Sequence, residues 1–469
     1  MRARLLRWSN DLRESYWFVP SVMAVAALLL ASAMVYLDSH AGSTWMDGLP
    51  WLYAARPDGA RSLLSSIGGS MIGVAGTTFS VTIAAVVYAS GQYGPRLLSN
   101  FMSDRGNQIT LGTFIATFVY ALVVLRTIRS AGEGGAGAPA FVPQLALLVA
   151  LILVLCSIAV LIYFIHHVPM RIHINNVIER IGDRLIAEID ARFPVFVGEP
   201  LTEAADDPGI PLAFRTCATP ADVDRRAAVR SKDVGYIQLI DEGSLMAAAR
   251  DHDLVIRLQY QAGDFAHKGS VLLEAWPAEA CDDEADKALR DAFSIGARRT
   301  ALQDLLFLVD ELVEIAARAL SPGVNDPFTA NSCLDWLGAA MADLARRDLP
   351  SRLRADDDGT LRVIAHPVTF DGFIDRAFGA LAQYASTDMI AGKRFLNALG
   401  DVALNCDNAG RIAVLTSQAR AFRALAERAL DGACRHAVLE RADDLLRALA
   451  EPDYKRRLRD GKAWLGGTA

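Results

Sequence analysis

Residues 62–95 read SLLSSIGGSMIGVAGTTFSVTIAAVVYASGQYGP, and no Asp, Glu, Lys or Arg interrupts them between Arg61 and Arg96. A helix needs about 20 apolar residues to cross the hydrocarbon of a bilayer, because every backbone polar group must be satisfied inside the segment. This stretch is long enough to cross as a single helix. It therefore predicts an integral membrane protein.

Three further apolar segments flank it, at residues 17–37, 106–125 and 141–165. The first has an alternative interpretation as a secretory signal peptide, because arginines precede it and Ala31-Ser32-Ala33 resembles a cleavage site. Its apolar run is long for a signal peptide, however, and three more spans follow. The pattern favours four transmembrane helices. None has an ionisable residue in its middle, which argues against a proton-coupled carrier or a voltage sensor.

The composition agrees with a membrane domain followed by a soluble one. Of the 469 residues 52% are hydrophobic, and the mean hydropathy of +0.24 is high for a soluble protein. The hydrophobic excess lies almost entirely in the first third of the chain. The net charge of -7 argues against general affinity for nucleic acid, which requires a clustered basic face. The cysteines are scattered without a CxxC spacing, as expected of free thiols in a reducing compartment.

Arginines near the ends of the spans indicate the orientation. With the N-terminus inside, the cytoplasmic ends carry more arginines than the outer ends. The cytoplasmic set is Arg2, Arg4, Arg7, Arg13, Arg96, Arg105, Arg171 and Arg180, and the outer set is Arg56, Arg61, Arg126 and Arg129. The difference predicts that both termini lie in the cytoplasm.

The second span carries a stripe of small and hydroxyl-bearing residues. They recur at intervals of three or four positions, which places them along one side of a helix. The stripe consists of Ser66, Gly69, Ser70, Gly73, Gly76, Thr77 and Ser80. Such a face permits close packing of another helix. The alternative is that its hydroxyls line a path for an ion or solute in a bundle or an oligomer.

Two segments beside the spans invite more specific interpretations. Residues 95–108 can form a short amphipathic helix at the cytoplasmic surface, and an ordinary connecting loop is the alternative. His166, His167 and His173 follow the fourth span, but no acidic residue or cysteine lies among them. We therefore expect no metal site there.

Residues 233–280 predict a small β-unit after a linker rich in Pro, Asp and Ala. The expected strands are 235–241, 254–260 and 270–276, with a helix at 242–250 and a glycine-containing turn at 262–269. The order strand, Gly-Asp-Phe, Lys-Gly, strand resembles the barrel-sandwich hybrids of lipoyl and biotinyl domains. The modified-lysine hairpin tip of those domains is missing, so the resemblance implies no swinging-arm cofactor.

The rest of the chain predicts a mainly helical domain. The expected helices are 300–320, 370–385, 388–405, 410–430 and 434–450, and a hairpin strand is expected at 361–365. Thr300 and Gln303 fit a capping box at the start of the first of these helices. In the turn 321–329, Asp326 fits the N-cap of a further helix. Asn325 and Asp326 are alternatively a contact for a ligand or cation.

The sequence shows no recognisable catalytic or phosphate-binding motif such as GxSxG, HExxH or GxxxxGK[ST]. The run at 356–359 resembles a calcium loop, but Arg354 and Ala365 stand where that loop needs acidic ligands. Arg298 and Arg299 are candidate anion contacts, and a solvated helix start is the alternative. We therefore expect no catalytic residues, no metal and no cofactor.

Several segments together are similar to one protein family. They are SYWFVPSVM, TTFSVTIAAVVYASGQYGPRLLSNFMSDRGNQITLGTFIATFVYALVVLRTIR, LIYFIHHVP and ALSPGVNDPFTA. They resemble a bacterial family of predicted membrane proteins known as domain of unknown function 2254, over nearly the whole chain. The resemblance implies residence in the bacterial inner membrane and supports four spans, but it brings no catalytic residues.

The predicted fold is an α-helical membrane domain of four transmembrane helices, followed by a mixed α+β, mainly helical, cytoplasmic domain with a barrel-sandwich-like β unit. The expected divisions are a membrane domain at 1–168, a connecting helix and linker at 169–232, the β unit at 233–280 and the helical domain at 281–469.

The leading functional hypothesis is a homo-oligomeric channel or pore-like module with a cytoplasmic regulatory domain. The alternative is a membrane-anchored sensor or scaffold, whose cytoplasmic domain binds a small ligand or protein without transport. Both hypotheses make the lipid bilayer a partner, both exclude nucleic acid, and neither identifies the ligand or ion.

Overall fold

The structure is a computed structural model that describes residues 15–41, 56–94, 104–131, 133, 140–192, 199–200, 209–215, 219–451 and 453–460. The chain divides into two compact units, one covering residues 10–176 and the other beginning at Val177. Residues 95–103, which contain most of the expected amphipathic helix, lie outside the described residues.

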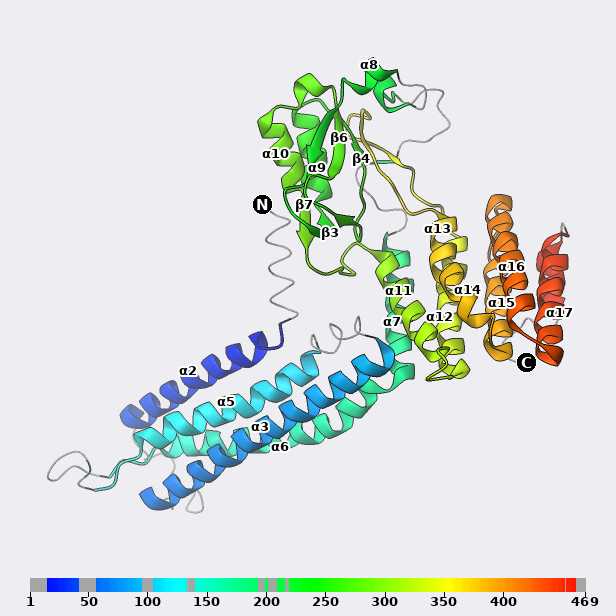
Figure 1. Cartoon of the computed structure of the whole chain (residues 1–469). Coiled ribbons are helices and arrows are strands. Elements are labelled where there is room, and N and C mark those ends of the chain that lie inside the picture. Colours follow the sequence, from blue (N-terminus) through cyan, green and yellow to red (C-terminus); the bar gives the residue numbers. More distant parts are fainter. Residues whose placement is uncertain are drawn as a thin grey trace. The chain divides into compact units, whose positions relative to one another are not determined.

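Four long helices form the first unit and lie side by side as a bundle (Figure 1). They are α2 (Phe18–Ala41), α3 (Pro57–Tyr93), α5 (Arg105–Thr127) and α6 (Gln144–Ile172). Each is long and apolar enough to cross a membrane, and each covers most of one of the four predicted spans.

Helix α5 is the centre of this bundle, because it contacts α2, α3 and α6. Gly112 permits the approach of α2, since a Cβ at this position would lie 2.5 Å from Sδ of Met23. Two buried polar contacts join α5 to α6: the hydroxyls of Thr117 and Ser157 are 3.0 Å apart, and Tyr120 donates to the carbonyl of Ala146 at 3.0 Å. The bundle is therefore held by close backbone approach and by satisfied polar groups.

The start of α6 receives its cap from a different helix. Pro143 occupies the N-cap position and its side chain makes no capping hydrogen bond. The carboxylate of Asp38, near the end of α2, instead accepts from the backbone N–H groups of Leu145 at 3.0 Å and Ala146 at 2.9 Å. These are two of the N–H groups that a helix start leaves without an intrahelical partner.

The second unit begins with the amphipathic helix α7 (Ile174–Arg192), which lies in the segment 169–232 where the sequence predicts a connecting helix. Val177, Ile181 and Leu185 are buried on one side of it. Gly182 lies directly against the indole of Trp336, where a Cβ would be 2.3 Å from Cε3. Glycine is thus the residue that lets α7 pack on α12 (Pro327–Ala345).

Two sheets follow. The larger has the order β1-β8-β9-β4-β6-β2 and the smaller has the order β5-β3-β7. The larger is made of β1 (Glu199–Pro200), β8 (Leu353–Ala355), β9 (Leu361–Ile364), β4 (Val255–Leu258), β6 (Val271–Trp276) and β2 (Ala227–Arg230). The smaller is made of β5 (Phe265–Ala266), β3 (Gly235–Ile240) and β7 (Phe293–Gly296).

The parallel pairing of β4 with β9 joins segments that are far apart in sequence. It brings the β8–β9 hairpin, which the sequence predicts, onto the strands of residues 233–280. The larger sheet thus takes strands from outside those residues. The expected barrel-sandwich arrangement is not confirmed. Helices α9 (Glu242–Asp251) and α10 (Asp283–Asp291) contribute to the apolar core shared with these strands.

The remaining helices form an array of their own around three phenylalanines. They are α11 (Leu305–Ala319), α12, α13 (Phe370–Ile374), the π-turn η5 (Asp375–Gly379), α14 (Ala380–Ala385), α15 (Met389–Leu404), α16 (Ala409–Ala429), α17 (Gly432–Leu449) and α18 (Tyr454–Asp460). Phe395 stacks on Phe422 with ring centroids 4.2 Å apart. The ring of Phe378 meets the ring of Phe395 edge-on, with centroids 5.4 Å apart. The predicted helices after residue 370 are confirmed, with η5 and α14 continuing α13.

The predicted capping box at Thr300 and Gln303 is wrong. Helix α11 begins at Leu305, and Asp304 is its N-cap, accepting from the N–H of Phe307 at 3.1 Å. The amide of Gln303 instead bonds both backbone groups of Ile240, as acceptor at 2.7 Å and donor at 2.9 Å. At Ile240, the last residue of β3, the Gln303 amide satisfies two backbone groups through its oxygen and its nitrogen. In a capping box only the amide oxygen would be used, and only one backbone group would be satisfied.

Candidate functional site

The second unit has a cavity of about 380 Å³, open to solvent on one side, between its sheets and its helical array. This volume lies within the roughly 300–1,000 Å³ typical of small-molecule sites. Its apolar lining residues are Ala191, Ile240, Leu258, Ala262, Leu302, Leu305, Leu306, Ala365, Pro367, Val368 and Phe373. Its polar lining residues are Glu242, Tyr260, Gln261, Gln303, Asp304, Arg354 and His366.

Arg354 is the buried cation of this lining, with only 1% of its surface exposed. It is the central residue of β8, paired in register with Val363 of β9. Leu353 on the same strand belongs to the small apolar cluster on the opposite side of the sheet. Strand alternation therefore places the Arg354 side chain on the cavity side.

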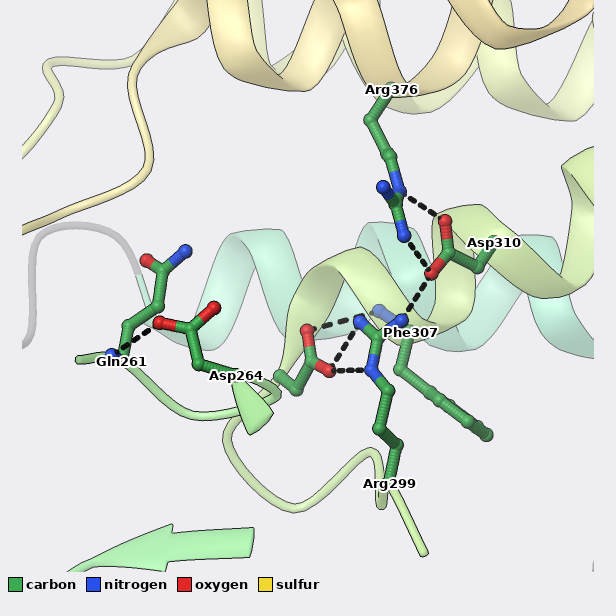
Figure 2. Close-up of polar contacts among 7 residues, drawn as sticks. Gln261, Asp264, Arg299, Phe307, Asp310 and Arg376 are labelled. Carbon is green, nitrogen blue, oxygen red and sulfur yellow. Dashed lines mark hydrogen bonds and ion pairs between the residues drawn. The ribbon is translucent and has the colours of Figure 1, made fainter. Parts of the chain in front are cut away.

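A chain of ion pairs starts at Asp304, which lines the cavity, and is buried except at Arg376, whose side chain is 46% exposed (Figure 2). Nε and Nη2 of Arg299 donate to Oδ2 of Asp304 at 2.9 and 2.6 Å, and its Nη1 donates to Asp310 at 2.5 Å. Arg376 donates to both carboxylate oxygens of Asp310, at 2.7 Å for the Nη2 contact. The guanidinium of Arg299 also lies 5.7 Å from the ring centroid of Phe307. The chain thus links the N-cap of α11 to the π-turn η5.

Local sequence explains why this arrangement forms. Gly263, with a φ of +95°, turns the chain so closely past Asp304 that a Cβ would lie 2.2 Å from its Oδ2. The carboxylate of Asp264 closes the same turn by accepting from the N–H of Gln261 at 2.8 Å. At the other end of the chain of ion pairs, η5 adds one residue to a helical turn and carries Arg376. Such π-turns are frequent at functional sites.

Burial governs the protonation of these groups. Burial raises the pKa of the Asp304 carboxyl, and Arg299 opposes that shift without cancelling it. Burial alone would lower the pKa of Arg299, but Asp304 and Asp310 hold it above its ordinary value. The pKa of Arg354 is lowered by burial, which the charge of Glu242 only partly offsets. An anionic group in the cavity would favour the charged form of Arg354.

The structure places the predicted site residues apart from one another. Arg298 is exposed, whereas Arg299 already has two carboxylate partners with which an anion would have to compete. Asp326 is the N-cap of α12, as predicted, and accepts from both the N–H and the hydroxyl of Thr329. Asn325 is exposed and has a φ of +52°. Neither Asn325 nor Asp326 lines the cavity.

The predicted stripe on α3 lies wholly on the exposed side of that helix. Ser66, Gly69, Ser70, Gly73, Gly76, Thr77 and Ser80 are all exposed. A Cβ at Gly73 or Gly76 would meet nothing within 4 Å, and the hydroxyl of Thr77 donates to the carbonyl of Gly73. Within the described part of a single chain the stripe therefore neither packs on a helix nor encloses a path. Either role needs a second molecule.

Of the histidines at the end of the fourth span, His167 contacts two other side chains. His167 is 2.8 Å from the carboxylate of Asp104, and its other ring nitrogen is 2.9 Å from the hydroxyl of Tyr163. Across the described residues, no group of three or more His, Cys, Asp or Glu side chains is arranged to hold a metal ion.

The sequence-based reasoning missed Arg354, Asp310 and Arg376. Asp310 left a signal, because it interrupts the apolar side of an otherwise regular amphipathic helix. Arg354 left none, since it stands in a strand of three residues beside an acidic turn. Only the parallel pairing of β4 and β9 brings it to the cavity.

Comparisons with known proteins identify relatives over most of the chain. A family model described as "Predicted membrane protein (DUF2254)" matches residues 13–401. An uncharacterized protein of Mycobacterium bovis is 31% identical over 437 residues, which covers 91% of this chain and 79% of the relative. An uncharacterized protein of Mycobacterium tuberculosis matches with the same identity and coverage. No solved structure matches the chain.

Proposed function

We propose that this chain, which belongs to the family of predicted membrane proteins of unknown function known as DUF2254, is a membrane-anchored sensor. Four N-terminal helices hold it in the bacterial inner membrane, with both termini in the cytoplasm. The second unit receives a small ligand in the cavity bordered by Arg354, Asp304 and Gln303. That cavity is the single observation that carries the proposal.

The surface of the first unit supports anchoring. Leu29, Leu155 and Ile162 are about two-thirds exposed, at 65%, 66% and 65%. Apolar side chains of this size on the outside of long helices would be costly in water and are favourable in hydrocarbon. The helices also satisfy their own backbone groups, as a bilayer requires.

The cavity supports ligand binding by its construction. It combines an apolar wall with a few polar groups at fixed positions, which is the general pattern of small-molecule sites. The ion pairs from Arg299 to Arg376 connect this wall to the helical array. A ligand that moves Asp304 would therefore act on the helices through charge partners that are already in contact.

Thermal unfolding of the full chain in lipid nanodiscs tests the sensor proposal. A panel of cellular metabolites should contain at least one compound that raises the melting temperature. Ala365→Phe, which fills the cavity, should abolish that rise. Ala413→Phe, on the exposed side of α16, is the matched control and should preserve it. No rise with any compound, or an equal rise in Ala365→Phe, contradicts the proposal.

A second candidate function is a homo-oligomeric pore, and the exposed α3 stripe is the observation that favours it. Small residues on a lipid-facing helix permit close approach of a second copy. Hydroxyls such as those of Thr77 and Ser80 would then lie near the axis of the assembly.

Gly73→Leu distinguishes this candidate. The wild-type protein should form an oligomer in native mass spectrometry and should support ion flux in liposomes, and Gly73→Leu should lose both. Cys156→Leu enlarges an exposed small residue on α6 and serves as the control, which should retain both. A monomeric wild-type protein, or flux that Gly73→Leu leaves intact, contradicts the pore.

A further inference from the structure

The turn between α11 and α12 has an exposed apolar surface that the proposed cavity does not use. Phe328 is 70% exposed, more than any other large apolar residue in the described part of the chain, including those of the four long helices. Val324, on the same turn, is 49% exposed. One exposed apolar side chain is ordinary on a protein surface, but two large ones on one short turn favour an interaction site.

The backbone of this turn is suited to an apolar environment. The N–H groups of residues 324–326 all donate to carbonyls within residues 319–321, at 2.8–3.0 Å. Asp326 is the only charged residue between Arg318 and Asp335, and its carboxylate caps α12. These bonds lower the cost of moving the turn out of water.

Two contacts show that α7 and α12 run in the same direction. Gly182 of α7 lies against the indole of Trp336. Further along both helices, Asp190 pairs with Arg347, just beyond the end of α12, at 2.5 Å. The step from the first contact to the second leads toward the C-terminus of each helix, so both helices begin at the same end of the second unit.

That end is the one at which the chain leaves its fourth span. Because a helix rises about 1.5 Å per residue, Phe328 lies about 12 Å before Trp336 along α12. By the same rise, Val177 lies about 7 Å before Gly182 along α7. Val177 follows Ile172, the last residue of α6, by five residues, which reach at most about 18 Å when fully extended. The turn is therefore tethered close to the end of that span.

The start of α15 adds a third apolar side chain at this end. Arg394 pairs with Asp335, and a Cβ at Gly338 would lie 3.2 Å from that of Ala398, so α15 runs parallel to α12. Ile390, in the first turn of α15, is 38% exposed. Exposed apolar side chains from the turn and from a neighbouring helix are thus at the same end of the second unit.

We propose that the turn 321–328 docks on the surface of the bilayer, with the side chains of Val324 and Phe328 inserted at the level of the lipid headgroups. Insertion removes exposed apolar surface from water and holds the second unit at the membrane through α12. The contact is apolar and requires no anionic lipid. The inference rests on membrane anchoring by the four helices and not on the ligand cavity.

The depth of the turn, rather than stability, reports this contact. An unfolded chain held by the same anchor can also insert Phe328, so the contact adds little to the free energy of unfolding. Bimane is attached at Gly323→Cys, an exposed position where a Cβ meets nothing within 4 Å, in a full chain without other cysteines. The protein is reconstituted in phosphatidylcholine nanodiscs, with and without phosphatidylcholine that carries a nitroxide near its headgroup.

The nitroxide should reduce the bimane fluorescence about twofold, since interfacial residues lie about 5–10 Å into the headgroup boundary. Bimane at Val223→Cys is the control for the label. Val223 is 40% exposed in α8 (Pro220–Val223), which lies far from α12 within the second unit (Figure 1). The nitroxide should leave its fluorescence unchanged.

A substitution beside the label locates the contact. Phe328→Ser in the Gly323→Cys chain should remove most of the quenching by lipid and increase quenching by aqueous iodide. Leu212→Ser, at a residue that is 59% exposed, is the matched control and should change neither. Circular dichroism establishes that each variant folds.

The possible occupants of the turn give different results. A label that neither lipid nor iodide quenches is covered by protein, such as a second copy of this chain, and overturns the inference. A label that only iodide quenches is in water and overturns it as well. Equal quenching by lipid at Val223→Cys, or quenching that Phe328→Ser does not reduce, has the same consequence. A chain that stays soluble without lipid removes the anchor too, whereas ligand binding in the cavity is judged separately by thermal unfolding.

Discussion

Single residues set the shape of the cavity wall, and Gly263 is the clearest case. Its φ of +95° and its distance from Asp304 are both unfavourable for any other residue. Gly269 closes the same loop with a φ of +88°, but a Cβ there would meet nothing within 4 Å. Backbone strain would therefore act on a substitution at either glycine, whereas steric conflict would act only at Gly263.

Gly263→Ala should destabilise the protein more than Gly269→Ala does. Backbone strain of about 1–3 kcal/mol applies to both variants. Gly263→Ala must also displace the carboxylate of Asp304 from its partners. Chemical denaturation of the full chain in nanodiscs measures the two free energies of unfolding. Equal losses would show that the contact with Asp304 does not matter.

Asp401 provides a second prediction at this scale. Burial raises its pKa to about 6, Arg394 opposes the shift, and Asp335 adds to it. The unfolded value is about 3.9, so the folded chain binds more protons than the unfolded chain between these two values. The contribution of Asp401 to stability is therefore complete below about pH 4 and is lost as the pH rises through 6.

Asp401→Asn should be more stable than the wild type at pH 7.5, by about 1–2 kcal/mol because the group is only partly buried. The advantage should shrink between pH 6 and pH 4. Thermal unfolding over this range measures it. A constant difference across the range would contradict the prediction.

At the scale of elements, hydrophobic periodicity predicted which segments are helices. Strand pairing between distant segments determined which residues line the cavity. The four apolar runs, the helix at Ile174 and the helices after residue 370 follow from local patterns that burial then reinforces. The sheet order does not follow from local patterns, because β4 and β9 are about a hundred residues apart in the chain. Arg354 is part of the cavity only because of that pairing.

The start of α11 also shows that local sequence patterns do not determine every contact. Thr300 and Gln303 form a favourable local pattern, but the backbone of Ile240 provides a better partner for the Gln303 amide. Asp304 then takes the cap and also pairs with Arg299. Tertiary contacts thus override a cap that local sequence predicts.

The cluster of Phe378, Phe395 and Phe422 carries much of the packing among the C-terminal helices. Phe395→Ala should cost about 3–5 kcal/mol, because Phe395 is fully buried and contacts both Phe378 and Phe422. Phe328→Ala, at a residue that is 70% exposed, should cost less than about 0.5 kcal/mol. Denaturation curves of both variants in nanodiscs give the comparison. Similar small losses would mean that this cluster is not a core.

At the scale of the whole molecule, the proposed orientation places the loop around Glu133 outside and the second unit inside. A variant that keeps Cys434 as its only cysteine should react with a membrane-impermeant maleimide only after cells are permeabilised, since Cys434 is exposed on α17. A variant with Glu133→Cys as its only cysteine should react in intact spheroplasts. The reverse pattern would show the opposite orientation.

The cap that Asp38 supplies to α6 has a consequence for how the chain is made. The acceptor and its donor at Leu145 are 107 positions apart, so the first helix is synthesised long before its partner exists. The carboxylate remains without this partner until the fourth helix has left the ribosome. A nascent chain that stops before Leu145 lacks the donor for this cap, so the four helices can complete their assembly only after the fourth helix has been synthesised.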